Sequence, residues 1–541
     1  MKATKLLTLL ALSFGLTELN ACSKSTPVVQ NQDKTTINVD IGDDAPTIDP
    51  VMAQDTTSAR VLYDLFAQLV DFDQSNNIIP GLAKSWNISP DGKTYTFHLR
   101  DGLKFSDGSP LTANDVVFSW QRVADPKNAS PYNMLIANLT NGQAIIDGKA
   151  QASTLGIKAL DSKTIQVNLT HPDSAFLQIC TMPNLAVVSK DNITKFASEW
   201  VNPKNMVTSG AYTIKEWVIK GHMLVVKNPN YYDANAVTIP NVNFLPLVDT
   251  SSALSQYRTG TVDITWIVPV DQYKSIQKEF GSQVNTVLQE GLYYLDFNMT
   301  LAKYANNKDL RQALNMAVNR DIIVNNVLGR NQKAAYSYVT PTIEDGKFAG
   351  LEYSWATLPH DKQLAMAKEL FAKSGYGPKN PLSITIGYNT NDGHKKIALA
   401  VAAMWQQAFG IDSIKVTQGN QEWKTFLKAR NTANYDIARD GWIADYNSVD
   451  SYTNLYYCKS PQNNSKYCNM QYNQLIDEAQ ATTDEANRTE LIKQAITIAQ
   501  NDYAIIPLFQ YTYTHLVNPR VKGYTPNINH FDHVQSKWYK F

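Results

Sequence analysis

Residues 435–446 read Tyr-Asp-Ile-Ala-Arg-Asp-Gly-Trp-Ile-Ala-Asp-Tyr, and the organisation of the chain can be worked out from them. Small, aromatic and β-branched residues without a proline predict that this stretch begins as a short strand. Gly441 interrupts the strand pattern, which indicates either a bulge or a place where another backbone comes close.

The same stretch places charges among apolar side chains. Arg439, Asp440 and Asp445 lie among isoleucine, tryptophan and tyrosine, and a charge in apolar surroundings is costly unless it is paired. We therefore interpret the stretch as a ligand cradle, in which Asp445 is the anion, Trp442 a flat wall and Gly441 the point where an extended chain approaches. The alternative is an exposed strand end whose charges face water.

Length and composition narrow the class of protein. The chain has 541 residues, which at roughly 150 residues per domain suggests about three domains. Lys+Arg and Asp+Glu both total 49, and this balance argues against a nucleic-acid binder, which needs a basic surface. The 10 Trp and 28 Tyr suit a protein that grips ligands with flat side chains.

The N-terminus is typical of an exported protein. Lys2 and Lys5 precede an apolar run at 6–16 that is too short for a membrane-spanning helix, so residues 1–21 are predicted to be a signal peptide. Residues 19–22 read Leu-Asn-Ala-Cys and look like a bacterial lipobox, which predicts a lipid on the Cys22 sulfur and a tether at 22–35. The alternative is ordinary signal cleavage after Ala21.

Three cysteines remain after Cys22. Cys458 and Cys468 bracket a polar loop, and because disulfides persist in exported proteins, they are predicted to pair. No histidine lies near the pair, which argues against a metal site. Cys180 lies among apolar residues and is expected to be buried.

Turn and capping signals divide the rest of the chain into strands and helices. Thr112 followed by Asp115 resembles a helix start, and Thr482 with Glu485 is interpreted as a capping box that opens a helix running to about residue 500. Strands are predicted at 36–41, 94–100 and 414–417, and amphipathic helices at 58–69, 309–328, 361–374 and 395–409. Helices and strands in this order predict an α/β architecture.

Residues 100–116 carry a family resemblance. They read Arg-Asp-Gly-Leu-Lys-Phe-Ser-Asp-Gly-Ser-Pro-Leu-Thr-Ala-Asn-Asp-Val and resemble the signature of the peptide-binding proteins of ABC importers, the extracellular solute-binding proteins of family 5. The similarity runs from about residue 37 to the C-terminus and is greatest to the oligopeptide receptors of Gram-negative bacteria. It includes 421–427, Gln-Glu-Trp-Lys-Thr-Phe-Leu.

The resemblance implies an α/β fold of the two-lobed periplasmic-binding-protein (Venus flytrap) type with an additional domain, three domains in all. Domain I would comprise 23–66, 192–290 and 513–541, domain II 67–191, and domain III 291–512.

The resemblance also implies a function. The chain would be a solute-binding receptor that encloses short oligopeptides in an interlobe cleft and delivers them to an ABC permease in the inner membrane. We expect a periplasmic monomer held to a membrane by lipidated Cys22, without enzyme activity, cofactor or metal. The alternatives are a receptor for dipeptides, murein tripeptide or another small solute, and an exported peptidase or chaperone-like protein. Motifs of Ser hydrolases, P-loop proteins and zinc proteases do not occur in the sequence.

Site residues carry over from the family position by position. Asp445 matches the aspartate that pairs with the peptide ammonium. The other matches are basic residues for the peptide carboxylate, walls and backbone partners, and further contacts: Arg430, Arg439 and His394; Gly441, Trp442 and Trp423; Tyr132, Tyr511, Gln54 and Thr56. Taken alone, these residues are open to plainer interpretations, with the tryptophans as core and Arg430 and His394 as solvated surface.

Two departures from the family stand out. Gln54 replaces an acid near the cleft, which puts a preference for basic ligand side chains in doubt. Gly291 and Ile443 occupy the positions of a cysteine pair in the most similar receptors, so that bridge is absent here.

Overall fold

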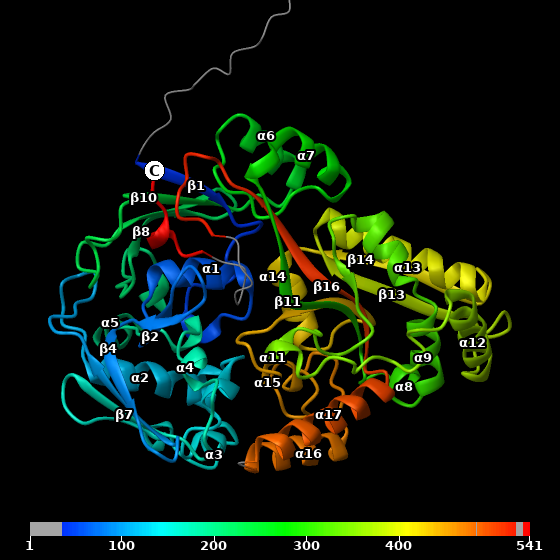
Figure 1. Cartoon of the computed structure of the whole chain (residues 1–541), viewed down its shortest axis with the longest axis horizontal. Helices are drawn as coiled ribbons and strands as arrows, with labels where there is room; N and C mark the ends of the chain where they lie inside the picture. The colour runs from blue at the N-terminus through cyan, green and yellow to red at the C-terminus, as the bar shows by residue number, and fades with distance from the viewer. Residues whose placement is uncertain (1–34, 483, 526–533) are drawn as a thin grey trace, which may run out of the picture. The chain divides into compact units, whose positions relative to one another are not determined.

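The computed structural model describes residues 35–482, 484–525 and 534–541 (Figure 1). The predicted signal peptide at 1–21, the lipidated Cys22 and the tether up to residue 34 lie outside the described residues. None of the described helices is long and apolar enough to cross a membrane.

Two four-stranded sheets form the part of the molecule that we name lobe 1. The strand order of the first is β1-β10-β9-β8, and that of the second is β4-β5-β7-β6. In the first sheet β1 runs parallel to β10. The strands are β1 (Thr36–Asp40), β4 (Ala83–Ile88), β5 (Thr94–Leu99), β6 (Ile157–Ala159), β7 (Thr164–Asn168), β8 (Tyr212–Val218), β9 (His222–Lys227) and β10 (Asn241–Leu245), and β2 (Val70–Phe72) pairs separately with β3 (Ile78–Pro80).

Helices cover these sheets as the apolar patterns predict. The helix α1 (Thr56–Leu65) packs on β8, and α2 (Ala113–Ala124) packs on β6 and β7. The predicted start of α2 is confirmed, because Thr112 and Asp115 form a capping box in which the Thr112 N–H donates to Asp115 Oδ2 at 2.9 Å. Within α2, the buried indole of Trp120 donates to the Leu185 carbonyl.

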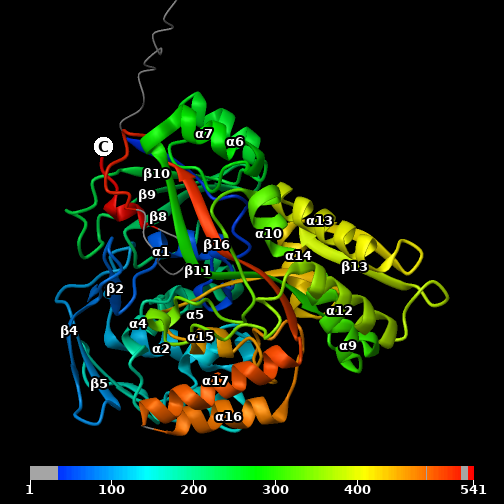
Figure 2. The ribbon, with the colours of Figure 1, turned by 45° about the vertical axis from the view of Figure 1, so that its right-hand side comes forward.

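A six-stranded mixed sheet with its helices forms lobe 2. Its strand order is β12-β16-β11-β15-β13-β14, and β13 runs parallel to both of its neighbours. The strands are β11 (Val284–Phe297), β12 (Lys333–Ala334), β13 (Leu382–Asn389), β14 (Ile414–Gln421), β15 (Ile437–Ile443) and β16 (Ile505–Leu516). The principal helices are α9 (Lys308–Met316), α12 (His360–Lys373), α13 (Asp392–Phe409), α14 (Trp423–Asn431), α16 (Met470–Ala481) and α17 (Glu485–Asn501). Figure 2 shows α9, α12 and α13 grouped around the β13 end of the sheet.

Two long strands connect the lobes. The antiparallel pair β11 and β16 runs from the region of α6 (Thr250–Arg258) and α7 (Tyr273–Phe280) into the centre of the six-stranded sheet (Figure 1). The pairing is irregular between Leu288 and Leu292, where the register shifts. Ile264 bridges both β1 and the end of β16, so the strand pair is joined to the first sheet.

Shorter helices complete the described chain. They are α3 (Gly142–Ile146), α4 (Phe176–Ile179), α5 (Lys190–Phe196), α8 (Ala302–Ala305), α10 (Arg320–Ile322) and α15 (Asp450–Thr453), together with α11 (Ile343–Gly346), whose backbone is not helical at Glu344 and Asp345. The predicted domain boundaries remain a prediction.

The single helix predicted at 309–328 is wrong. The segment divides into α9, α10 and a π-helical turn at Ile323–Leu328. The buried Arg320 guanidinium donates to the carbonyls of Asn315 and Val318 at the end of α9, and the Asn319 side chain caps a new helix by accepting from the Ile322 N–H. Gly329 ends the segment in the left-handed conformation, as predicted.

The capping box predicted at Thr482 is also wrong. The N-cap of α17 lies two residues later, because the Asp484 carboxylate accepts from the N–H groups of Ala486 and Asn487. Thr482 instead ends α16. Aspartate at the N-cap satisfies the same free backbone donors that the sequence pattern assigned to threonine.

A disulfide joins Cys458 to Cys468 in lobe 2, and Cys180 is free and buried. The bridge closes a loop with a sequence separation of 10, so its removal should lower the free energy of unfolding by about 3 kcal/mol in the chain-entropy model. Denaturant unfolding of wild-type protein and of the Cys458→Ser/Cys468→Ser variant measures this. Equal stabilities, or two free thiols in peptide maps of the oxidised protein, would contradict it.

Candidate ligand-binding site

One edge of β15 is unpaired where the predicted cradle lies. The strand predicted at the start of 435–446 is confirmed as β15, and it pairs with β11 along its whole length. On its other side, β15 pairs with β13 only at Ile437 and Ala438. From Arg439 to Ile443 no strand of the described chain pairs with that side, so an extended ligand could pair with this edge, except at the Gly441 N–H, which already donates to Asp440 Oδ1 at 2.7 Å.

The glycine at position 441 makes room for the Tyr511 side chain and does not form a bulge. Its register with Tyr293 of β11 is regular, so the predicted bulge is absent. A Cβ atom at Gly441 would lie 2.1 Å from the Tyr511 hydroxyl oxygen, so only glycine leaves room for that ring. The Tyr511 hydroxyl accepts a hydrogen bond from the Arg439 guanidinium at 3.0 Å. The group that comes close to Gly441 is therefore a tyrosine side chain of β16 and not the second backbone that the sequence predicted.

Asp445 follows β15 and is a buried carboxylate without a cation. It is 1% exposed, and it accepts hydrogen bonds from the Tyr132 hydroxyl at 3.1 Å and from Ser451 Oγ at 3.3 Å. Burial raises the pKa of Asp445 to about 7 against the opposing effect of these two hydrogen bonds. In the described parts of the chain no basic side chain lies within 4.0 Å of it. A buried anion in this state is complementary to an ammonium group.

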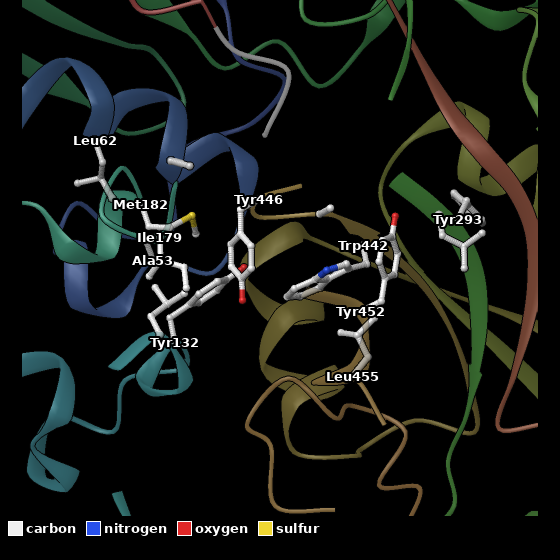
Figure 3. Packing of buried hydrophobic residues seen from close by; sticks show 14 of the residues in the cluster. Ala53, Leu62, Tyr132, Ile179, Met182, Tyr293, Trp442, Tyr446, Tyr452 and Leu455 are labelled. Atoms are coloured by element: carbon white, nitrogen blue, oxygen red, sulfur yellow. The ribbon is translucent and has the colours of Figure 1, made fainter. Parts of the chain in front are cut away.

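Aromatic rings bring the two lobes together beside Asp445. Tyr132 of lobe 1 stacks on Trp442 of β15, with ring centroids 6.3 Å apart and planes 13° apart. Figure 3 shows Tyr132, Tyr446 and Trp442 gathered between the lobes. Three more hydrogen bonds cross between lobes, from Asn431 to Gln54, from Gln462 to the Pro131 carbonyl and from the Asn447 N–H to Gln178.

A cavity with about 1220 Å³ of space free of protein atoms, part of it open to solvent, lies at the Arg439 end of β15. Arg439 donates to Asn389 and Tyr511 and lies over the Tyr293 ring, 5.2 Å from its centroid. No described carboxylate lies within 4.0 Å of its guanidinium. Tyr511 and three other predicted site residues line the same cavity: Thr56, His394 and Trp423.

His394 acts here as a neutral hydrogen-bonding group. Its Nδ1 lies 3.3 Å from the Tyr293 hydroxyl. Burial lowers the pKa of His394 well below its usual value, and the charges of Arg439 and Arg330 add to this effect. Its match to a third basic residue of the family stays a prediction.

Arg330 is a site residue that sequence reasoning missed. It lines the cavity, is 8% exposed, and donates to the Val268 carbonyl at 3.4 Å. Burial lowers its pKa to about 10, and no acid of the described chain lies within 4.0 Å of it. Its position directly after Gly329 did not indicate a ligand site, because the cavity wall that contains Arg330 is built from segments far apart in the sequence.

Arg430 and Gln54 already have protein partners. The Arg430 guanidinium lies 2.6 Å from the Asp440 carboxylate, and both side chains are buried. The Gln54 carbonyl oxygen accepts from the Asn431 amide at 2.7 Å. The predicted residues thus separate into an anionic end around Asp445 and a cationic end around Arg439.

The two ends are separated by a short distance. Arg439 and Asp445 are six positions apart in the sequence, so an extended backbone places them at most about 20 Å from each other. A strand edge of this length, with opposite charges at its ends, is complementary to a short extended chain that carries both charges.

Comparison with known proteins identifies the family. The family model described as bacterial extracellular solute-binding proteins, family 5 Middle, matches residues 77–464. The chain is 36% identical to the periplasmic oligopeptide-binding protein OppA of Salmonella typhimurium over 518 residues, which cover 94% of each protein.

Solved structures agree with the whole described fold. The complex of Haemophilus influenzae OppA with the peptide RPPGFSPFR matches with a TM-score of 0.91 at 34% identity, covering 94% of this chain and 99% of the other. The Escherichia coli murein tripeptide binding protein MppA matches at 0.90, also with 34% identity and coverage of 94% and 99%. Against an unliganded open form of MppA, with 34% identity and coverage of 94% and 98%, the score is 0.65. The lobes described here therefore have the closed arrangement, and the chain belongs to the bacterial extracellular solute-binding proteins of family 5, with their lobed α/β fold.

Proposed function

We propose that this protein is the receptor of an ABC importer, that it encloses short oligopeptides between its lobes, and that it delivers them to the inner-membrane permease. One observation carries the proposal: an unpaired strand edge has a buried, uncompensated carboxylate at one end and uncompensated guanidinium groups at the other. A zwitterionic extended chain satisfies all three features together.

Each part of the peptide has a partner in this arrangement. The peptide ammonium pairs with Asp445, and the main chain pairs with the free edge between Arg439 and Ile443. The peptide carboxylate turns toward Arg439 and Arg330. Side chains extend into the cavity, whose volume accommodates different sequences, so length and charged ends matter more than sequence.

Closure of the lobes completes the ammonium subsite. Tyr132 approaches Asp445 from lobe 1, so the carboxylate loses water only when the lobes meet. Without a ligand cation, closing buries an unpaired charge, and with one it buries a neutral pair. Peptide binding is in this way coupled to a hinge motion.

We extend the proposal to the fate of the bound peptide and to the location and anchoring of the protein. Family members are binding proteins and not enzymes, and we propose that this chain likewise binds its peptide without cleaving it. We also propose a periplasmic monomer anchored through lipidated Cys22, since the relative OppA is periplasmic and 19–22 resembles a lipobox.

The Asp445–ammonium pair can be tested from both sides. Asp445→Asn should weaken peptide binding by about 100- to 1,000-fold, because it leaves the ammonium buried without its partner. N-terminal acetylation of the peptide should weaken its binding to wild-type protein by a similar factor. The same acetylation should weaken binding to the Asp445→Asn variant much less. Calorimetry of this double-mutant cycle measures the coupling. Asp436→Asn is a matched control, because Asp436 pairs with Lys303 just before β15. If the two losses simply add, Asp445 does not contact the ammonium.

Closure of the ligand-free protein should depend on pH. In the closed form the pKa of Asp445 is raised to about 7 from 3.8, whereas in a water-filled open cleft it returns toward its ordinary value. Between these values the closed form binds more protons, so lowering the pH from 7 to 5 should favour closure by up to about tenfold per pH unit. Small-angle scattering measures the closed fraction. Asp445→Asn should reduce the dependence, to which Asp43, with a pKa raised to about 6, also contributes, and an unchanged pH slope in that variant would contradict the explanation.

Anchoring is tested at Cys22. The Cys22→Ala variant should move from the membrane fraction to the soluble fraction of the cell envelope. Intact mass of the mature wild-type protein should show a lipidated Cys22, and an unmodified N-terminus excludes the anchor.

A further inference from the structure

The Arg430 guanidinium is bound by a carboxylate of the protein itself. Its Nη1 lies 2.6 Å from Asp440 Oδ1, and the same oxygen accepts the Gly441 N–H at 2.7 Å. Asn464 donates to the other oxygen at 3.0 Å. The buried Asp440 side chain thus accepts from the Arg430 guanidinium and from the Gly441 N–H of β15. These are the two kinds of donor that would bind a peptide carboxylate.

A second acid keeps this arrangement electrically balanced. Asp296 of β11 lies two residues from Tyr294, the direct partner of Asp440, and so faces the same side of the sheet. Burial and the neighbouring Asp440 raise the pKa of Asp296 well above its usual value, which favours its neutral form. With Asp296 neutral, the Arg430–Asp440 pair contains one positive and one negative charge, so Asp440 already compensates Arg430, and Lys466 adds a positive charge near Asp296.

The cluster lies between the two ends of the site. Asp440 and Gly441, which form the cluster with Arg430, lie between Arg439 and Asp445 along the chain. Gly441 is also closer to Asp445 along the chain than Arg439 is. A carboxylate held at Arg430 would therefore belong to a shorter ligand than one held at Arg439.

We propose that Asp440 is a built-in carboxylate that excludes the carboxylate of the shortest peptides from Arg430 and the Gly441 N–H, and so sets the lower limit of ligand length. The inference rests on the proposed peptide-binding function. A dipeptide whose ammonium is at Asp445 brings its carboxylate to a place that already holds a like charge. A longer peptide passes this place and reaches Arg439 and Arg330.

The test removes both acids, because Asp296 alone could ionise and replace Asp440. Di-, tri-, tetra- and pentapeptides of one composition, each with a free or an amidated C-terminus, are titrated by calorimetry into wild-type protein and the Asp296→Asn/Asp440→Asn variant. Wild-type protein should prefer the longer peptides. In the variant, the ratio of dipeptide Kd to tetrapeptide Kd should fall at least tenfold, and amidated dipeptides should not share this gain. Asp436→Asn removes one charge next to β15 but outside the cluster, and it should leave the ratio unchanged.

A second variant covers the risk that an unpaired Arg430 prevents folding. Arg430→Gln/Asp440→Asn removes both charges of the pair, a change that buried ion pairs tolerate better than loss of one partner. Tetrapeptides should bind it within about threefold of wild-type protein, because Arg430 does not hold their carboxylate.

Three results overturn the inference. They are an unchanged length ratio in the variant lacking both acids, a loss of tetrapeptide binding of 100-fold or more in the Arg430→Gln/Asp440→Asn variant, and a wild-type preference for dipeptides. Wild-type protein that binds no peptide of the series overturns the proposed function, and this inference falls with it. Peptide binding with an unchanged ratio leaves the function intact and removes the role of Asp440.

Discussion

A charge that is buried between two lobes has to meet an opposite charge, and this constraint separates the structural groups of the cleft from those directed at a ligand. Arg430 and Asp440 satisfy each other within one lobe. Among the described residues, Asp445 has only hydroxyl partners, and Arg439 and Arg330 have hydroxyl, amide and carbonyl partners. Charges that the protein leaves uncompensated mark where the ligand's own charges belong.

The fold brings these charges together where β15 of lobe 2 meets Tyr132 of lobe 1. The central strand β11 pairs with one edge of β15, and the other edge has no strand partner from Arg439 to Ile443 in the described chain. Because residue 441 has no side chain, Tyr511 of β16 can extend over β11, and its hydroxyl accepts a hydrogen bond from the Arg439 guanidinium. The cationic end of the site is therefore fixed by the sheet, whereas the anionic end is completed by Tyr132 from the other lobe.

Local sequence patterns predicted the elements whose structure depends on neighbouring residues. They failed where contacts with residues distant in the sequence determine the structure. The strand at 435–446 and the α2 start at Thr112 were predictable, because alternation and capping act within one turn or strand. The break after α9 was not, because it follows from the buried side chain of Arg320. In the site, the pattern around Asp445 and the family resemblance together pointed to a charge that the structure shows to be buried. The Arg430–Asp440 pair and Arg330 escaped because side chains of different elements meet there only in the folded chain.

The path of the chain through its sheets also governs when the protein can fold. The first sheet pairs β1 with β10, and both Arg60 and Asp64 of α1 bond to Ser536 near the C-terminus. The six-stranded sheet lacks one of its two longest strands until residues 505–516 have been made. During synthesis, N-terminal segments of many proteins fold as they emerge, but here lobe 2 lacks a central strand until residue 516 has been made, and α1 of lobe 1 lacks its Ser536 partner for longer still. Both lobes therefore remain without part of their tertiary contacts during most of the synthesis of the chain.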